Sequence, residues 1–86
     1  VCVVTGAASK RGLGLATARL FARHGAKVAI LDLDLAAARE AADGLPGEGH
    51  LGLACDVSRR PACHQAVAAV LFAHGRIDVL VNNAGI

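Results

Sequence analysis

The fold of this chain is decided by its opening stretch, Val1-Cys2-Val3-Val4-Thr5-Gly6-Ala7-Ala8-Ser9-Lys10-Arg11-Gly12-Leu13-Gly14. The apolar run at its start predicts a buried strand, which stops at a glycine-rich turn and is followed by an amphipathic helix. Glycines in such a turn let the backbone approach a pyrophosphate, and the free N–H groups of the next helix's first turn face that anion. The layout is typical of a dinucleotide-binding site, although glycines also occur in turns that merely connect a strand to a helix.

Composition and charge argue against two other function classes. With 86 residues the chain forms at most one small domain, to which we assign residues 1–86. The net charge is +2 and basic residues occur at most in pairs, whereas a nucleic-acid-binding protein needs a clustered basic face. The longest apolar run, residues 66–73, is too short to span a membrane, so we expect neither a nucleic acid nor a membrane as partner.

The cysteines indicate a reducing compartment. There are three, an odd number without repeated spacing, which argues against a disulfide framework and favours a cytoplasmic location. Cys63 and His64 are adjacent, and adjacent positions on a helix point in different directions. We therefore expect no metal site.

Strand-like and helix-like segments alternate along the whole chain. We expect strands over residues 1–4, 27–31, 50–54 and 77–81. Helices are expected over 12–24, 35–43 and from Ser58, as N-cap, to about His74, with Gly25 ending the first in a left-handed conformation. The apolar stripe of the first helix is expected at Leu13, Ala16, Thr17, Leu20 and Phe21, and that of the third at Cys63, Ala66, Val67, Val70 and Leu71.

Four strands separated by three helices predict an α/β fold, built from right-handed β-α-β units. The expected arrangement is a doubly wound parallel sheet with strand order 3-2-1-4. In such a sheet a ligand binds at the carboxyl ends of the strands, in the crevice between strands 1 and 4 where the order reverses. The polar residues considered next all follow strands at that edge, as a binding site requires and a purely structural sheet does not.

Asp32 closes the second predicted strand and is the candidate ligand of a ribose. Its carboxylate can accept hydrogen bonds from ribose hydroxyls and repel a 2′-phosphate, which predicts NAD over NADP. Two like unit charges about 4 Å apart repel by roughly 4 kcal/mol at an effective dielectric near 20. Arg11 could instead meet a 2′-phosphate, so NADP stays the alternative. Asp32 could also cap a helix, although Asp34 fits that role better.

Further polar residues follow the third and fourth predicted strands. Asp56 can accept a hydrogen bond from an adenine amino group while Val57 packs on the ring, although the same pair is ordinary in a loop before a helix. Asn82 and Asn83 can hydrogen-bond across to the first turn, for example to Thr5, and hold the crevice closed. A plain turn is the alternative.

Together these residues resemble the amino-terminal part of the short-chain dehydrogenase/reductase family. The similarity covers essentially the whole chain and rests on Thr5-Gly6, Gly12-Leu13-Gly14, Asp32, Asp56-Val57 and Asp78-Val79-Leu80-Val81-Asn82-Asn83-Ala84-Gly85. The resemblance implies a Rossmann fold and NAD(P)-dependent oxidoreduction of small-molecule alcohols and ketones, usually by homo-oligomers. The cofactor-binding residues that it implies are Gly6, Ser9, Arg11, Gly12, Leu13, Gly14, Asp32, Leu33, Asp56, Val57, Asn83, Ala84 and Gly85.

Two departures from the family pattern bear on function. Five residues, Ala7 to Arg11, separate the first two glycines where the family usually has three, so Lys10 and Arg11 resemble an extension of the phosphate turn. The family's catalytic serine and Tyr-x-x-x-Lys pair follow the Asn-Asn-Ala-Gly stretch, and this chain contains no tyrosine. We therefore assign no catalytic residue.

The resemblance implies that these residues are the cofactor-binding portion of an NAD-preferring dehydrogenase, truncated on its C-terminal side. The full-length enzyme would transfer hydride reversibly between a secondary alcohol and a ketone. The alternative is a non-catalytic nucleotide-binding module or an inert remnant of an enzyme gene.

Overall fold

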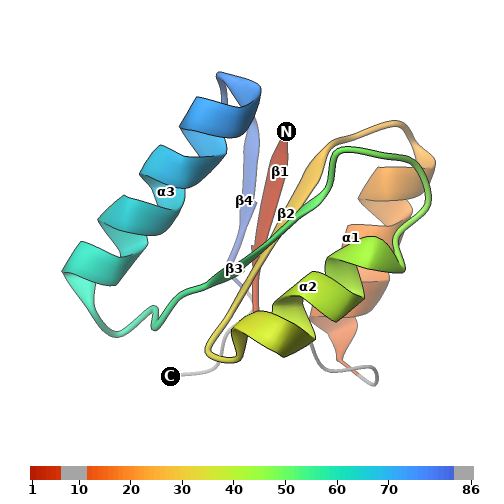
Figure 1. Ribbon diagram of the computed structural model, residues 1–86. Helices are drawn as coiled ribbons and strands as arrows, with labels where there is room; N and C mark the ends of the chain where they lie inside the picture. Colours follow the sequence, from red (N-terminus) through yellow and green to blue (C-terminus); the bar gives the residue numbers. More distant parts are fainter. Residues whose placement is uncertain (7–11, 83–86) are drawn as a thin grey trace.

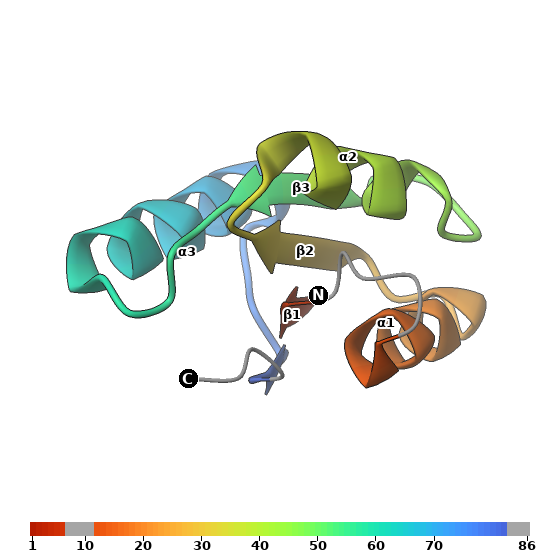
Figure 2. The same cartoon turned by 90° about the horizontal axis from the view of Figure 1, so that it is seen from below.

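The computed structural model describes residues 1–6 and 12–82 and shows an open sheet covered by helices on both faces (Figure 1). In that part of the chain the sheet has four strands in the order β3-β2-β1-β4, and neighbouring strands are parallel (Figure 2). The predicted doubly wound α/β architecture is confirmed. The elements are β1 (Cys2–Thr5), α1 (Leu13–Arg23), β2 (Val28–Asp32), α2 (Leu35–Asp43), β3 (Leu51–Ala54), α3 (Arg60–His74) and β4 (Val79–Val81).

The two faces of the sheet are covered by different helices because the strand order reverses once. α1 and α2 lie on one face, which we call the two-helix face, where they connect β1 to β2 and β2 to β3 (Figure 1). α3 lies on the other, the one-helix face, and carries the chain from β3 back to β4. Crossovers of one hand force this change of face where the order reverses. The reversal lies between β1 and β4, where a doubly wound sheet forms its ligand crevice.

α1 packs on the sheet through a face that differs from most of the predicted apolar stripe. The buried positions are Gly14, Leu15, Ala18 and Ala22. Of the predicted stripe, Phe21 packs against the core, whereas Leu13 and Leu20 are 81% and 55% exposed. Three of the four buried residues are glycine or alanine, which let a helix approach a sheet closely.

The end of α1 confirms the prediction for Gly25. This residue has a φ of +89°, in the left-handed region that glycine adopts without strain. Its N–H donates to the Ala22 carbonyl at 3.0 Å, and the Ala26 N–H donates to the Phe21 carbonyl at 3.1 Å. Phe21 and Ala26 both pack against the core of the two-helix face, so the helix ends in a Schellman motif with its apolar contact.

α2 begins and ends at the predicted residues, and its start is fixed by a capping residue, Asp34. The Asp34 carboxylate accepts a hydrogen bond from the Ala37 N–H at 3.2 Å and caps the first turn. The helix then lies directly on β3 at Gly52. A Cβ atom added to Gly52 would lie 2.5 Å from the backbone carbonyl of Ala38, so only glycine fits there.

β3 starts one residue later than predicted because the His50 side chain replaces a backbone partner. The Val28 N–H of β2 donates to His50 Nδ1 at 3.1 Å, and His50 Nε2 lies 2.7 Å from the Pro46 carbonyl oxygen. Since Nδ1 accepts, the proton sits on Nε2, which donates to Pro46. Regular pairing with β2 therefore begins at Leu51, which lies opposite Ala29.

α3 starts at Arg60 and not after a Ser58 cap, so that part of the prediction was wrong. Pro61 lies in the first turn, where its missing N–H costs nothing, and Arg59 occupies the cap position. Ala66 and Val70 are buried as predicted. Val67 and Leu71 are 42% and 44% exposed, because α3 is the only helix on this face within the described residues.

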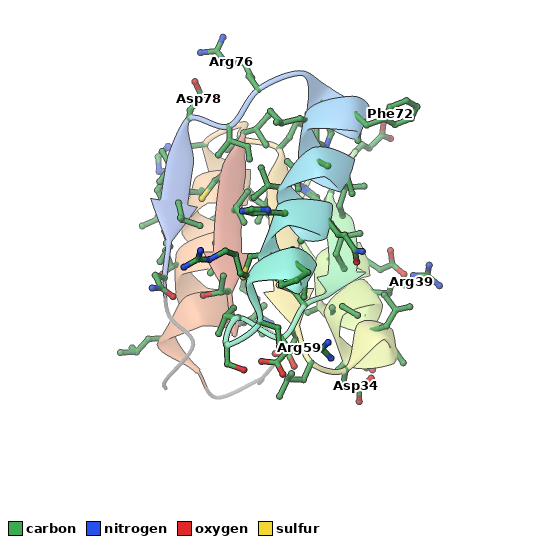
Figure 3. The ribbon with its side chains drawn as sticks, turned by 90° about the vertical axis from the view of Figure 1, so that its left-hand side faces the viewer. Asp34, Arg39, Arg59, Phe72, Arg76 and Asp78 are labelled. Atoms are coloured by element: carbon green, nitrogen blue, oxygen red, sulfur yellow. The ribbon has the colours of Figure 1, made fainter. Side chains whose placement is uncertain are left out.

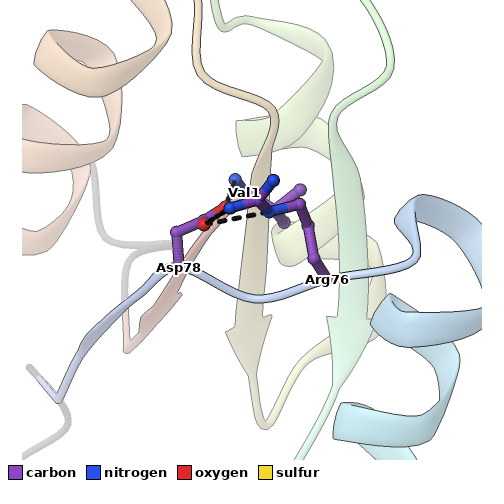
Figure 4. A network of polar contacts seen from close by, with 3 residues as sticks. All are labelled: Val1, Arg76 and Asp78. Carbon is purple, nitrogen blue, oxygen red and sulfur yellow. Dashed lines mark hydrogen bonds and ion pairs between the residues drawn. The ribbon is translucent and has the colours of Figure 1, made fainter.

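The amino-terminal edge of the sheet is held by Asp78, just before β4 (Figure 4). Its carboxylate accepts hydrogen bonds from the Val1 amino group at 2.7 Å and from Arg76 Nε at 2.9 Å. Both hydrogen bonds lower the pKa of the Asp78 carboxyl from its ordinary value, and the bond from the Val1 amino group lowers it more than the bond from Arg76. The Asp78 and Val79 N–H groups both donate to the Val1 carbonyl, which is why β4 starts at Val79 and not at the predicted Ile77.

Candidate functional site

The candidate site lies at the carboxyl edge of the sheet, where the ends of all four described strands meet. Thr5 ends β1 and Asp32 ends β2, while Asp56 and Asn82 follow β3 and β4. Because the strands are parallel, residues that follow them gather on the same edge. Figure 3 shows this edge through Asp34 and Arg59, on the side of the molecule away from Arg76 and Asp78.

The turn after β1 is joined to the end of β4 across the switch point. Thr5 is only 5% exposed, and its hydroxyl donates to Asn82 Oδ1 at 3.2 Å. The same hydroxyl lies 3.5 Å from the Val81 carbonyl oxygen. The predicted hydrogen bond between Thr5 and the residues after β4 is therefore confirmed. It ties the two strands together at the point where the crevice opens.

The turn then leaves β1 at Gly6 and enters α1 at Gly12. Gly6 has a φ of +66°, and its N–H donates to the Leu31 carbonyl at 2.8 Å, so a residue without Cβ is required here. Gly12 occupies the N-cap position of α1, and no side chain among the described residues caps this helix. The first turn also carries no acidic side chain, so the N–H groups at this end favour an external anion.

Asp32 and Asp34 have separate roles after β2. Asp32 is half-buried, and its Oδ1 accepts the Asp34 N–H at 3.3 Å, which orients the carboxylate at the strand end. The Cys55 N–H donates to the Asp32 carbonyl at 2.7 Å and fixes the neighbouring loop beside it. Asp34 caps α2, as the sequence favoured, so the helix does not require Asp32 as its cap. Leu33 between them is 73% exposed at the rim of the edge.

Asp56 is held in place by Ser58, a contact that the sequence analysis missed. The Ser58 N–H and hydroxyl both donate to Asp56 Oδ1, at 3.0 and 2.6 Å. These bonds lower the pKa of the Asp56 carboxyl from its ordinary value, and nearby Arg59 adds to the effect. The Asp-x-Ser spacing is the sequence signal for such a turn. Ser58 therefore orients the carboxylate and does not cap α3.

An apolar groove runs along the one-helix face to this edge. Its volume is about 230 Å³, and it is lined by Val3, Thr5, Leu31, Cys55, Val57, Cys63, Val67, Ile77, Leu80 and Asn82. Thr5, Val57 and Asn82 lie at its carboxyl end, so the groove opens at the candidate site. Val57 is half-buried, with its side chain packed against the core of this face.

Several predicted site residues fall outside the described part of the chain. They are Ser9, Arg11, Asn83, Ala84 and Gly85. Of the other predicted residues, the structure brings Gly6, Gly12, Leu13, Gly14, Asp32, Leu33, Asp56 and Val57 to the carboxyl edge. Gly14 is buried in the first turn of α1, and Leu13 is exposed at the start of that helix.

Within residues 1–6 and 12–82, no three His, Cys, Asp or Glu side chains are grouped so as to hold a metal ion. None of the helices in this part of the chain has the length and apolar character that crossing a lipid bilayer requires.

Comparison with known proteins finds relatives that align with nearly the whole chain. Residues 6–86 match the family model described as enoyl-(acyl carrier protein) reductase. The chain is 54% identical, over 98% of its length and 34% of the relative's, to an uncharacterized short-chain type dehydrogenase/reductase of Sinorhizobium fredii. The chain thus spans about a third of the length of the curated relatives that it matches.

Two solved structures have the same fold. A 3-ketoacyl-(acyl-carrier-protein) reductase from Brucella melitensis, complexed with NADH, superposes with a TM-score of 0.90 at 44% identity. The alignment covers 99% of this chain and 34% of that one. Sorbitol-6-phosphate 2-dehydrogenase from Erwinia amylovora superposes with a TM-score of 0.91 at 31% identity, over 100% of this chain and 34% of the other.

Proposed function

This chain belongs to the short-chain dehydrogenase/reductase family, and we propose that it is the cofactor-binding portion of a dehydrogenase that prefers NAD(H) to NADP(H). The observation that carries the proposal is that Gly6, Asp32 and Asp56 all lie at the carboxyl edge of the sheet, together with the uncapped start of α1. Each of these groups suits a different part of a dinucleotide.

The residues at this edge fit the chemical groups of the cofactor. The N–H groups at the start of α1, around Gly12 and Gly14, suit the pyrophosphate because they carry the positive end of the helix dipole. Asp32 would accept hydrogen bonds from the adenosine ribose. Asp56, which Ser58 orients, would accept the adenine amino group while Val57 packs on the ring.

The preference for NAD(H) rests on the charge of Asp32. A carboxylate at the ribose position repels a 2′-phosphate, by roughly 4 kcal/mol for unit charges about 4 Å apart at an effective dielectric near 20. Asp34 adds a second negative charge two residues later. The similar Brucella melitensis reductase was crystallised with NADH, which agrees with this preference.

The proposed reaction is reversible hydride transfer between a secondary alcohol and a ketone of a small-molecule substrate. Bound NAD(H) supplies or accepts the hydride. This chain contributes cofactor binding and orientation, and it contains no tyrosine to serve as the family's proton donor. We therefore place the catalytic Ser and Tyr-x-x-x-Lys in sequence beyond residue 86 of a longer, cytoplasmic, homo-oligomeric enzyme.

The test is a fluorescence titration with NADH and NADPH of the polypeptide made from its own gene. We expect Asp32→Ala to weaken NADH binding by roughly 10- to 100-fold, as loss of a hydrogen bond to a charged group does. NADPH binding should weaken less or improve, so the affinity ratio should shift toward NADPH. Asp43→Ala is the matched control, because Asp43 is an exposed aspartate at the far end of α2.

An unchanged NADH-to-NADPH ratio in Asp32→Ala would contradict the role given to Asp32. Turnover is tested separately, by following NADH formation with a panel of secondary alcohols. Cofactor binding without any turnover by the full-length polypeptide would favour the alternative of a non-catalytic nucleotide-binding module.

A further inference from the structure

Two cysteines lie on the one-helix face beside the loop that carries Asp56. Cys55 directly follows β3, and Cys63 lies near the start of α3. Both side chains pack in the core of this face and line the same apolar groove, and Cys63 is near enough to Cys55 to raise the pKa of its thiol. Cys63 Sγ also lies 3.6 Å from the Val57 carbonyl oxygen, to which it donates. The segment between the cysteines is thus already folded back on itself.

We propose that Cys55 and Cys63 are a reversible redox pair that closes to an intramolecular disulfide when the protein meets a low-molecular-weight disulfide. The thiolate of Cys63 attacks the small disulfide, which forms a mixed disulfide and releases one small thiol. The thiolate of Cys55 then attacks Cys63 Sγ and releases the second small thiol. Two protein thiols are oxidised, one small disulfide is reduced to two thiols, and the two protons pass to the released thiolates.

The different burial of the two thiols sets this order of attack. Cys55 is only 5% exposed, whereas Cys63 is half-buried and is the one an external disulfide can reach. Burial, and next the neighbouring Cys63, raise the pKa of the Cys55 thiol, which makes it the slower of the two to react with an external disulfide. Once Cys63 carries a mixed disulfide, Cys55 is the thiol that lies in the same core beside it and can displace the small thiol.

The third cysteine provides a control. Cys2 is 1% exposed and belongs to the core of the two-helix face, whereas Cys55 and Cys63 belong to the core on the opposite side of the sheet. The sheet separates Cys2 from the pair. We therefore expect Cys2 to take no part in the exchange.

The consequence for cofactor binding rests on the proposed function. A disulfide between Cys55 and Cys63 would brace the segment that carries Asp56 and Val57, the proposed contacts to adenine. The hydrogen bonds from Ser58 that orient Asp56 lie within the same segment. We expect oxidation to move this segment and to lower the affinity for NADH.

The first test detects the disulfide itself. The reduced polypeptide is treated with oxidised glutathione, its free thiols are alkylated, and the product is digested with trypsin. Cleavage after Arg39, Arg59 and Arg76 puts Cys55 in the peptide of residues 40–59 and Cys63 in that of residues 60–76, since the Arg60-Pro61 bond resists trypsin. We expect mass spectrometry to find these two peptides joined in the wild type and in Cys2→Ala, and separate in Cys63→Ala.

Three outcomes of this test would overturn the proposal. They are a glutathione adduct on Cys63 that never resolves to the cross-link, a cross-link that includes Cys2, and cross-links formed between chains. None of these readouts depends on cofactor binding, so the test is independent of the proposed function.

The second test measures NADH affinity before and after oxidation. We expect a loss of about tenfold or more in the wild type, reversal by dithiothreitol, and no change in Cys63→Ala. An intact cross-link with unchanged NADH affinity would refute the link to the Asp56 segment. A reduced protein that binds no NADH would instead refute the proposed function and leave the redox pair standing.

Discussion

The two faces of this sheet are packed to different tightness, although the same strands form both. On the two-helix face α1 and α2 meet the strands mostly through glycine and alanine, and α2 approaches β3 so closely that Gly52 has no room for a methyl group. On the one-helix face α3 leaves a groove of about 230 Å³ and half-exposes Val67 and Leu71. The comparison teaches that stability is concentrated on one face, while the other retains space beside the candidate site.

The largest expected effect is on the tight face, at Gly52. In Gly52→Ala the new Cβ would lie 2.5 Å from backbone atoms of Ala38 and Arg39, which cannot rotate away as a side chain could. We expect a loss of about 3 kcal/mol or more in the free energy of unfolding, at or above the upper end for overpacked sites. Urea unfolding of the polypeptide made from its own gene measures it.

Gly44→Ala is the matched control for this substitution. Gly44 has a φ of −82°, and a Cβ there would lie 3.6 Å from the nearest atom, the Ala41 carbonyl oxygen. We expect this variant to be neutral or to gain about 0.4–1 kcal/mol, since alanine restricts the unfolded chain more than glycine does. Equal effects at Gly52 and Gly44 would show that α2 does not press on β3 as described.

The next effect compares two neighbouring residues of β1. Val4 points to the two-helix face and Val3 to the one-helix face, where it lines the groove; the two are 0% and 2% exposed. Because a tightly packed site cannot collapse around a deletion, we expect Val4→Ala to cost about 3 kcal/mol and Val3→Ala about half as much. The same urea experiment measures both. A larger cost for Val3→Ala would reverse the comparison of the two faces.

A smaller effect concerns how α2 and α3, on opposite faces of the sheet, begin. α2 is capped by the Asp34 carboxylate, whereas no side chain in the described residues caps α3. We expect Asp34→Ala to cost about 1 kcal/mol and Asp34→Asn much less, because asparagine also caps well. Thermal unfolding of the two variants, side by side, separates loss of the cap from loss of the charge. Equal losses in both would assign the effect to charge and contradict the capping role.

The fold and the strand order could be predicted from the sequence because they depend on the order of elements along the chain and not on how individual side chains pack. Alternating apolar segments and glycine turns specify the β-α-β units, and strand ends were predicted within about two residues. The predicted buried stripe of α1 was wrong at Leu13 and Leu20 because the helix turns Gly14, Leu15, Ala18 and Ala22 to the sheet, and close approach favours the small residues at three of these four positions. Size complementarity between two elements is not visible in either one alone.

In the candidate site, too, some features could be predicted and others were missed. The position of Asp32 at the end of β2, the Asp34 cap of α2 and the contact between Thr5 and Asn82 could be predicted, because the ends of the strands and helices are marked in the sequence. The contact of Gly52 with α2 was missed, although a glycine within a strand is the usual signal for close backbone approach. The packing of Cys55 and Cys63 in one core was missed because it depends on how α3 lies on the sheet, which neither segment shows alone.

The smallest effect is expected at Ser58, on the loop that leads to α3. The Ser58 bonds lower the pKa of Asp56 below its ordinary value of 3.8, so they stabilise the folded state above that pH and lose this effect as pH falls through the lowered pKa. We expect Ser58→Ala to lower the thermal midpoint slightly at neutral pH and not at all in strong acid. In an Asp56→Asn background the effect of Ser58→Ala should not vary with pH, because position 56 no longer titrates. A deficit that persists below the lowered pKa would mean that Ser58 acts through the helix and not through Asp56.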